Sequence, residues 1–96
     1  LHALLTRPET LDRVRGVPAD RAKAIEEVLR WDPPVTLQPR VNPKTIEWRG
    51  NSVEAGSMLF GVSCANRDPA YFDEGDAFDI DRSCPVPPLT FGNGLH

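Results

Sequence analysis

The sequence has little positive charge, few aromatic residues and no long apolar run, and these shortages narrow what the chain can do. Its 11 Lys and Arg against 14 Asp and Glu give a net charge of −3, whereas a surface that follows nucleic-acid phosphates needs an excess of cations. No apolar run approaches the ~18 residues that span a membrane, and the first residues show no basic-then-apolar signal. We therefore expect a cytoplasmic protein that binds no nucleic acid and has no membrane span in this segment.

Cysteine is also scarce. Cys64 and Cys84 lie twenty residues apart and form no Cys-x-x-Cys pair. With His2 and His96 they make four potential zinc ligands, but the spacing matches no common structural site. Two reduced thiols are the expected state in the cytoplasm. We predict that both cysteines are small buried residues and that this chain holds no metal.

Helical periodicity is confined to the first third of the chain. Pro8 suits the first position of a helix, and the spacing of Leu11 and Val14 predicts a helix over 8–15. A second helix is predicted over 18–31, where Pro33-Pro34 prevents its continuation. The apolar stripe of this second helix is expected to comprise Ala22, Ile25, Val28 and Leu29.

Residues 35–63 have the composition of short strands. Val35, Thr36 and Leu37 predict a strand, and residues 45–54 predict a hairpin that turns at Gly50-Asn51. The apolar run from Met58 to Val62 is short enough to favour a buried strand over a helix. Ten prolines predict long irregular connections, so residues 66–96 are expected to be mostly loop.

Four short motifs follow one another along the chain: Glu27-Val28-Leu29-Arg30, Asn66-Arg67-Asp68-Pro69, Phe78-Asp79-Ile80-Asp81-Arg82, and the terminal Phe91-Gly92-Asn93-Gly94-Leu95-His96. Their order and spacing resemble the cytochrome P-450 family. In that family a Phe-Gly-x-Gly-x-His-x-Cys loop presents a cysteine thiolate to haem iron. The resemblance covers nearly all of the chain and roughly the C-terminal quarter of a full-length member, so the expected cysteine ligand lies beyond His96.

The resemblance implies an α+β fragment of a mainly-α fold over residues 1–96. It would comprise two short helices, a sheet region over 35–63, and a long irregular meander that leads into the haem loop over 66–96. The parent protein would be a bacterial, soluble haem-thiolate monooxygenase. Such an enzyme inserts one oxygen atom from O₂ into a small organic substrate, with electrons from a ferredoxin- or flavodoxin-type redox partner.

The chain by itself is expected to be inactive and to bind no haem, because the thiolate is absent. The alternative is a stand-alone, non-enzymatic remnant that acts as a folding or interaction module. Apolar surfaces and strand edges without partners predict that the isolated chain self-associates or remains partly disordered, whereas a stand-alone module would be a well-folded monomer.

The first candidate site is a charged cluster. Glu27 and Arg30 are three residues apart on a helix and away from its apolar stripe, which by itself is typical of a solvated ion pair. The resemblance implies instead that the pair is buried and joined by Arg82. Glu27, Arg30 and Arg82 would then be a structural lock that holds the loop, not catalytic groups.

The second candidate site is the cofactor surface. The resemblance implies that Arg40 and His96 bind a haem propionate and that Phe91, Gly92 and Gly94 form the haem loop, where glycine lets the backbone approach the porphyrin. It also implies that Val35, Thr36 and Leu37 line the substrate side of the haem, although such residues could equally belong to a core. Both cysteines precede the loop, so neither is expected to bind iron.

Overall fold

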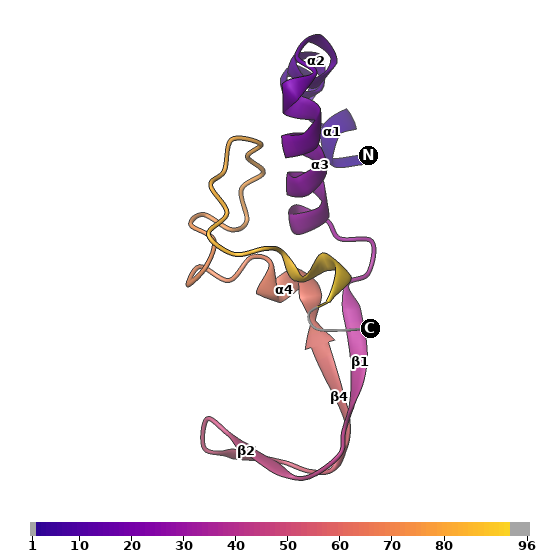
Figure 1. The fold of residues 1–96 in the computed structure, drawn as a ribbon, viewed down its shortest axis with the longest axis vertical. Helices are drawn as coiled ribbons and strands as arrows, with labels where there is room; N and C mark the ends of the chain where they lie inside the picture. The colour runs from indigo at the N-terminus through magenta and orange to yellow at the C-terminus, as the bar shows by residue number, and fades with distance from the viewer. Residues whose placement is uncertain (1, 93–96) are drawn as a thin grey trace.

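The computed structural model describes residues 2–92, with only the backbone at 59 and 60. Helices occupy one end of the molecule, a β-ribbon extends from the other, and a long loop segment lies beside their junction (Figure 1). The elements are α1 (His2–Leu5), α2 (Pro8–Gly16), α3 (Ala19–Trp31), β1 (Leu37–Asn42), β2 (Ile46–Trp48), β3 (Asn51–Val53), β4 (Gly56–Gly61), α4 (Val62–Ala65) and the 3₁₀ helix η1 (Leu89–Phe91). The predicted α+β class is confirmed, and α4 is an element that the sequence analysis did not predict.

The molecule is elongated, with principal extents of 52 × 24 × 23 Å. Its Cα radius of gyration is 16.4 Å, whereas a compact domain of this length has a radius of about 12–13 Å. The described part therefore lacks the layered packing in which each helix or sheet covers another.

Helix α3 is buried on a different face from the one that its apolar residues predict. Its buried residues are Asp20, Ala24, Glu27 and Arg30. Ala22 is exposed, Ile25 is 59% exposed, and Val28 and Leu29 are only partly buried. The apolar stripe was therefore the wrong guide to the packed face, because the loop that packs on α3 offers backbone carbonyls and charged groups to its polar side.

Strands β1 and β4 form an antiparallel pair whose register runs from Leu37 opposite Gly61 to Asn42 opposite Gly56. The first predicted strand, 35–37, overlaps β1 only at Leu37. Among residues 2–92, no strand pairs with Val35 and Thr36, since the chain turns into α4 directly after Gly61.

The hairpin of β2 and β3 turns at Arg49 and Gly50, not at Gly50-Asn51. Both turn residues have positive φ, 48° and 77°, and Asn51 instead pairs with Trp48. Two successive positive φ values are typical of the two-residue turns that match the right-handed twist of paired strands. Arg49 accepts this conformation, and its guanidinium lies 5.6 Å from the centre of the Trp48 ring.

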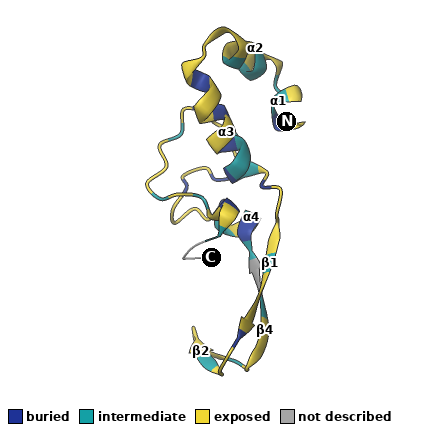
Figure 2. Ribbon diagram, turned by 45° about the vertical axis from the view of Figure 1, so that its right-hand side comes forward, coloured by how far each residue is buried: buried dark blue, intermediate teal, exposed yellow. Residues whose placement is uncertain are grey.

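The buried residues gather around α3, α4 and the loop beside them, whereas the ribbon is mostly exposed (Figure 2). Among the described residues the apolar core is small: Ala3, Ala24, Val62, Phe72 and Ile80. A slightly larger polar set is buried with it: Asp20, Glu27, Arg30, Asn42, Asn66 and Thr90. No helix within residues 2–92 combines the length and apolarity needed to cross a membrane.

Candidate functional site

Arg30, in the last turn of α3, uses all five of its N–H groups. Nε and Nη2 donate to the two carboxylate oxygens of Glu27, each at 2.7 Å. The remaining three N–H groups donate to the backbone carbonyls of Asn66, Gly75 and Ala77 at 2.8–2.9 Å. Because a guanidinium has five donors and no acceptor, Arg30 has no hydrogen-bonding capacity left for a ligand.

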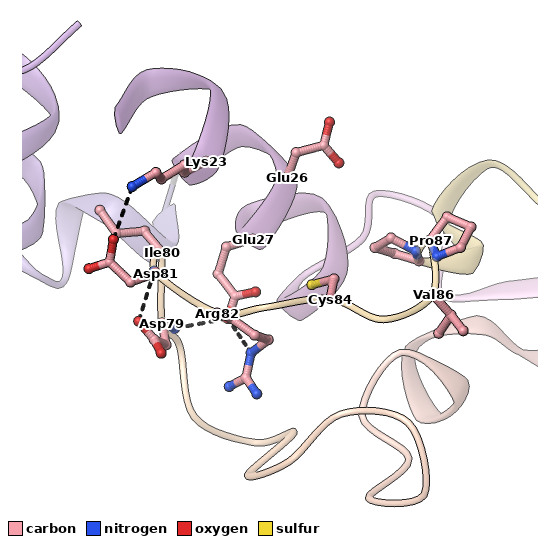
Figure 3. A pocket seen from close by; sticks show the side chains of 11 residues that line it. Lys23, Glu26, Glu27, Asp79, Ile80, Asp81, Arg82, Cys84, Val86 and Pro87 are labelled. Carbon is pink, nitrogen blue, oxygen red and sulfur yellow. Dashed lines mark hydrogen bonds and ion pairs between the residues drawn. The ribbon is translucent and has the colours of Figure 1, made fainter. Parts of the chain in front are cut away.

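Arg82 joins the same carboxylate from the loop. Its Nε lies 3.4 Å from Glu27 Oε1, and the backbone N–H of Asp79 donates to that oxygen at 2.8 Å. The other Arg82 nitrogens donate to backbone carbonyls of Asp73, Glu74 and Ala77. The structure thus brings Glu27, Arg30 and Arg82 together, and their contacts hold residues 73–79 without a sheet or helix there. Figure 3 shows Glu27 facing Arg82 and Asp79 of the loop.

Gly75 belongs to this arrangement through its backbone. Its carbonyl accepts from Arg30, and a Cβ at this position would overlap the backbone carbonyl of Arg67. Only glycine fits here. The sequence analysis had placed this position only within the expected loop of residues 66–96.

A second charged cluster, which the sequence analysis missed, joins α2 and α3 to the loop. Arg13 forms two hydrogen bonds with Asp81, at 2.6 and 2.8 Å, and one with Asp20, at 2.7 Å. Lys23 lies 3.2 Å from Asp81 and 3.3 Å from Asp20. The hydrogen bonds from Arg13, then those from Lys23, hold the pKa of the Asp81 carboxyl well below its usual range. Asp81 is 68 residues from Arg13, and no local pattern connects positions so far apart.

Arg40 lies in the middle of β1, next to the start of the terminal glycine-rich motif. Gly92 has φ of 82°, and a Cβ there would lie 3.2 Å from Gln38 Oε1 and 3.6 Å from Arg40 Nη2. Within the described part of the chain, the side chain of Arg40 makes one hydrogen bond, a long one of 3.5 Å to Gln38. No carboxylate among the described residues pairs with Arg40, so its charge is available to an anionic group.

These residues surround a cavity of about 330 Å³. Its lining is mostly apolar apart from two side chains of β1: Gln38, Arg40, Gly61, Val62, Ala65, Leu89 and Gly92. This lining fits one edge of a flat, carboxylate-bearing group such as haem. Arg40 would face the carboxylate, and the apolar side chains and the backbone of Gly92 would face the flat ring. Gln38 is a further candidate contact that sequence reasoning missed, although its position two before Arg40 on a strand places it on the same face.

The other predicted site residues that the structure describes do not line the cavity beside Arg40. Phe91 is 67% exposed, while Gly94 and His96 fall outside the described residues. Val35, Thr36 and Leu37 are all exposed and line no part of the Arg40 cavity. The structure therefore does not bring them together with Arg40, and their alternative role in a core does not apply to the described residues.

The prediction that both cysteines are buried is wrong. Cys64 and Cys84 are free and exposed, because α4 buries only Val62 and the proline-rich segment that contains Cys84 runs along the surface. Partial burial raises the pKa of the Cys84 thiol, which lies with Glu27, Asp79 and Arg82 around a cavity of about 490 Å³ (Figure 3). Neither cysteine lines the Arg40 cavity, and the described residues contain no cluster of three metal-binding side chains.

Comparison with known proteins finds one family model, cytochrome P450, that matches residues 22–85. The biotin biosynthesis cytochrome P450 of Bacillus subtilis is 39% identical over 94 residues, which cover 97% of this chain and 24% of that protein. Biflaviolin synthase CYP158A1 of Streptomyces coelicolor is 38% identical over 99 residues, 100% of this chain and 24% of its own length.

Solved structures give the same result. The crystal structure of P450BioI, in complex with acyl carrier protein ligated to hexadec-9Z-enoic acid, matches with a TM-score of 0.88 and 39% identity over 98% of this chain and 25% of its own. CYP109E1 from Bacillus megaterium in complex with testosterone matches with a TM-score of 0.88 and 29% identity, over 97% of this chain and 26% of its own. The chain thus spans about a quarter of the length of these relatives.

Proposed function

Because the chain belongs to the cytochrome P450 family, we propose that the whole protein containing it is a haem-thiolate monooxygenase. It would insert one oxygen atom from O₂ into a small organic substrate, with electrons from a ferredoxin- or flavodoxin-type redox partner. The observation that carries this proposal is the approach of Arg40 to Gly92 beside an apolar cavity. Haem bound through a thiolate supplies the oxygen-activating chemistry.

The residues of this chain would hold and orient that group. Arg40 would pair with a propionate, since a guanidinium binds a carboxylate with two parallel hydrogen bonds. Gly92 would let the backbone approach the ring, because its φ of 82° favours glycine and a Cβ there would lie only 3.2 Å from Gln38 Oε1. Phe91, Gly94 and His96 are proposed as further parts of the haem loop, with His96 at a propionate, on the family motif. Val35, Thr36 and Leu37 keep their proposed place on the substrate side on the same ground.

The cluster of Glu27, Arg30 and Arg82 is proposed as the lock that shapes the loop. Its guanidinium groups bind loop carbonyls, so the loop conformation is held by side chains where no regular backbone pairing exists. Arg30 has no free donor, and its side chain is fully buried. These properties fit a structural role and leave no group free to touch substrate.

The isolated 96-residue chain is proposed to be catalytically inactive, to bind no haem and to self-associate. Large apolar side chains are exposed at both ends of the molecule, among them Leu5, Ile25, Val41 and Trp48. The two-stranded sheets also leave strand edges unpaired, and such edges pair readily with other chains. The elongated shape argues against the alternative of an independently folded interaction module.

The function is tested on the whole protein. We expect it to bind haem with a thiolate-type spectrum of its ferrous carbon monoxide complex and to incorporate label from isotopically labelled O₂ into a product. Arg40→Ala should accelerate haem loss, whereas Arg49→Ala, on the exposed hairpin, should not. A whole protein that binds no haem, or haem without thiolate ligation, would overturn the proposal.

A further inference from the structure

We propose that Asn66 and Thr90 form a clasp, defined by these two side chains, that positions the start of the haem loop on the C-terminal end of α3. The inference rests on the proposed function, because the loop that it positions is the proposed haem loop. Asn66 follows α4 and Thr90 lies in η1, and the two are 0% and 3% exposed. They are positioning residues, since neither side chain lines the cavity beside Arg40.

The clasp is a directed chain of hydrogen bonds. The backbone N–H of Leu89 donates to Asn66 Oδ1 at 2.7 Å, and Asn66 Nδ2 donates to Thr90 Oγ1 at 3.3 Å. Thr90 Oγ1 in turn donates to the backbone carbonyl of Leu29 at 2.7 Å. The hydroxyl has one proton, which goes to Leu29, so it must accept from Asn66. Hence the orientation of the Asn66 amide follows from its neighbours.

The end of α3 leaves a carbonyl available for this chain. Inside an α-helix the carbonyl of Leu29 would accept from the N–H four residues later. That residue is Pro33, which has no N–H. Thr90 supplies the missing donor. The carbonyl of Trp31, the last residue of the helix, accepts separately from Arg67 at 2.7 Å. Pro33 thus leaves free the Leu29 carbonyl through which Thr90 docks on the end of α3.

Asn66 also connects the clasp to the charged lock. Its backbone carbonyl accepts from Arg30 at 2.8 Å, while its side chain holds Leu89 and Thr90. One buried residue therefore joins the helix of the lock to η1. In such a fully satisfied buried network, loss of one member leaves the others unpaired at high cost.

The clasp lies next to the proposed cofactor cavity. Leu89 and Gly92 both line that cavity, and the Gly92 N–H donates to the Leu89 carbonyl at 2.9 Å. A shift of Leu89 therefore moves Gly92, where a Cβ would lie 3.2 Å from Gln38 Oε1, closer than an ordinary contact. Through these two contacts, Asn66 and Thr90 set how the backbone approaches the cofactor.

The test uses Thr90→Val in the whole protein, because valine keeps the shape of threonine and removes only the hydroxyl. Two readouts are measured: amide hydrogen exchange across residues 86–92, and the rate of haem transfer to an acceptor apoprotein. We expect both to rise roughly tenfold, as the loss of hydrogen bonds at a buried site predicts. Thr90→Ser keeps the hydroxyl and should stay within about twofold of the unmodified protein.

The matched control is Thr45→Val. Thr45 lies on the remote hairpin and donates a 3.0 Å hydrogen bond to Glu54, so the same substitution there should change neither readout. If Thr90→Val matches the unmodified protein in exchange, or speeds haem transfer without speeding exchange, the clasp is overturned.

Two further measurements test the clasp without relying on the Thr90→Val variant or on haem binding. In the unmodified protein the Leu89 amide must be protected from exchange, since Asn66 accepts from it, and rapid exchange there would overturn the clasp even if Thr90→Val did not fold. If the whole protein binds no haem, the proposed function fails, but the exchange experiment on the haem-free protein still decides whether the clasp exists.

Discussion

Arg30 and Glu27, which lie one helical turn apart on α3, form two hydrogen bonds with each other. Their side chains are 0% and 3% exposed. On a solvated helix such a pair contributes little to stability. Here the loop covers it, and every Arg30 donor finds an acceptor, so the pair connects α3 to segments more than 35 residues away.

Arg82→Ala should lower the free energy of unfolding of the whole protein by about 2–4 kcal/mol. The substitution leaves the buried Glu27 with one cation fewer and removes the donor to three loop carbonyls, and breaking a buried charged cluster is strongly destabilising. Urea unfolding measures the effect. Arg49→Ala, at the exposed hairpin turn, is the control and should change stability by less than about 0.5 kcal/mol.

Glu27→Gln and Arg82→Ala should be non-additive when combined, since each removes the same contact. A double-mutant cycle on the whole protein measures the coupling, and residues in one buried network commonly give about 0.5–3 kcal/mol. Additive losses would mean that the two side chains act independently, contrary to a shared lock.

Acid should weaken the contact between Asp81 and Arg13. The pKa of Asp81 is lowered in the folded protein, chiefly by the hydrogen bonds from Arg13, so its ionised form stabilises the fold above the unfolded pKa of about 3.9. That stability is lost progressively as pH falls below about 4. Asp81→Asn should flatten the decline of stability between neutral and acidic pH, as followed by urea unfolding.

The control for this experiment is Asp12→Asn, which removes a carboxylate from an exposed pair with Arg15 whose atoms lie 3.5 Å apart. It should leave the acid dependence nearly unchanged. Added salt should also reduce the difference between Asp81→Asn and the unmodified protein, because Asp81 and Arg13 are both partly exposed and salt screens such charges.

Neither Cys64 nor Cys84 should bind the haem iron. Both lie outside the cavity beside Arg40, so Cys64→Ser and Cys84→Ser should each preserve the thiolate-type spectrum of the whole protein. Loss of that spectrum in either variant would assign the ligand to that cysteine. Native Cys84 should also react with thiol reagents more slowly than in urea, since its raised pKa lowers the thiolate fraction.

The isolated 96-residue chain should associate with itself, and Val41→Lys should reduce the association. Val41 is 78% exposed on β1, and a lysine at an open strand edge discourages pairing between chains. Sedimentation at several concentrations measures the change, with Thr45→Lys as the control on the hairpin. A monomer with sharp cooperative melting would contradict this expectation and favour an independent module.

Local chemistry made several elements predictable. Pro8 marks the start of α2, and Pro33-Pro34 confine α3 to residues before them, because proline suits the first turn of a helix but cannot continue one. Alternation and a glycine turn gave the hairpin, although its turn lies one residue earlier than predicted. The motif order was enough to identify the family, since each motif is a short contiguous stretch.

Local pattern failed where burial depends on a distant partner. The apolar stripe of α3 pointed to the wrong face, because the loop that covers the helix binds through carbonyls and charges instead of apolar groups. Cys64 and Cys84 were placed inside on composition, yet the short α4 and the proline-rich segment leave both at the surface.

The sequence by itself determined the approximate bounds of α2 and α3, the presence of a hairpin and which family this chain joins, because proline, glycine and short motifs act over a few residues. Only the tertiary structure decided that Asp81 meets Arg13, that Gly92 approaches Arg40, and that Thr90 caps the carbonyl of Leu29. These partners are separated by about 50 to 70 positions. Their pairing follows from how the loop folds back on α3, which no local spacing of residues specifies.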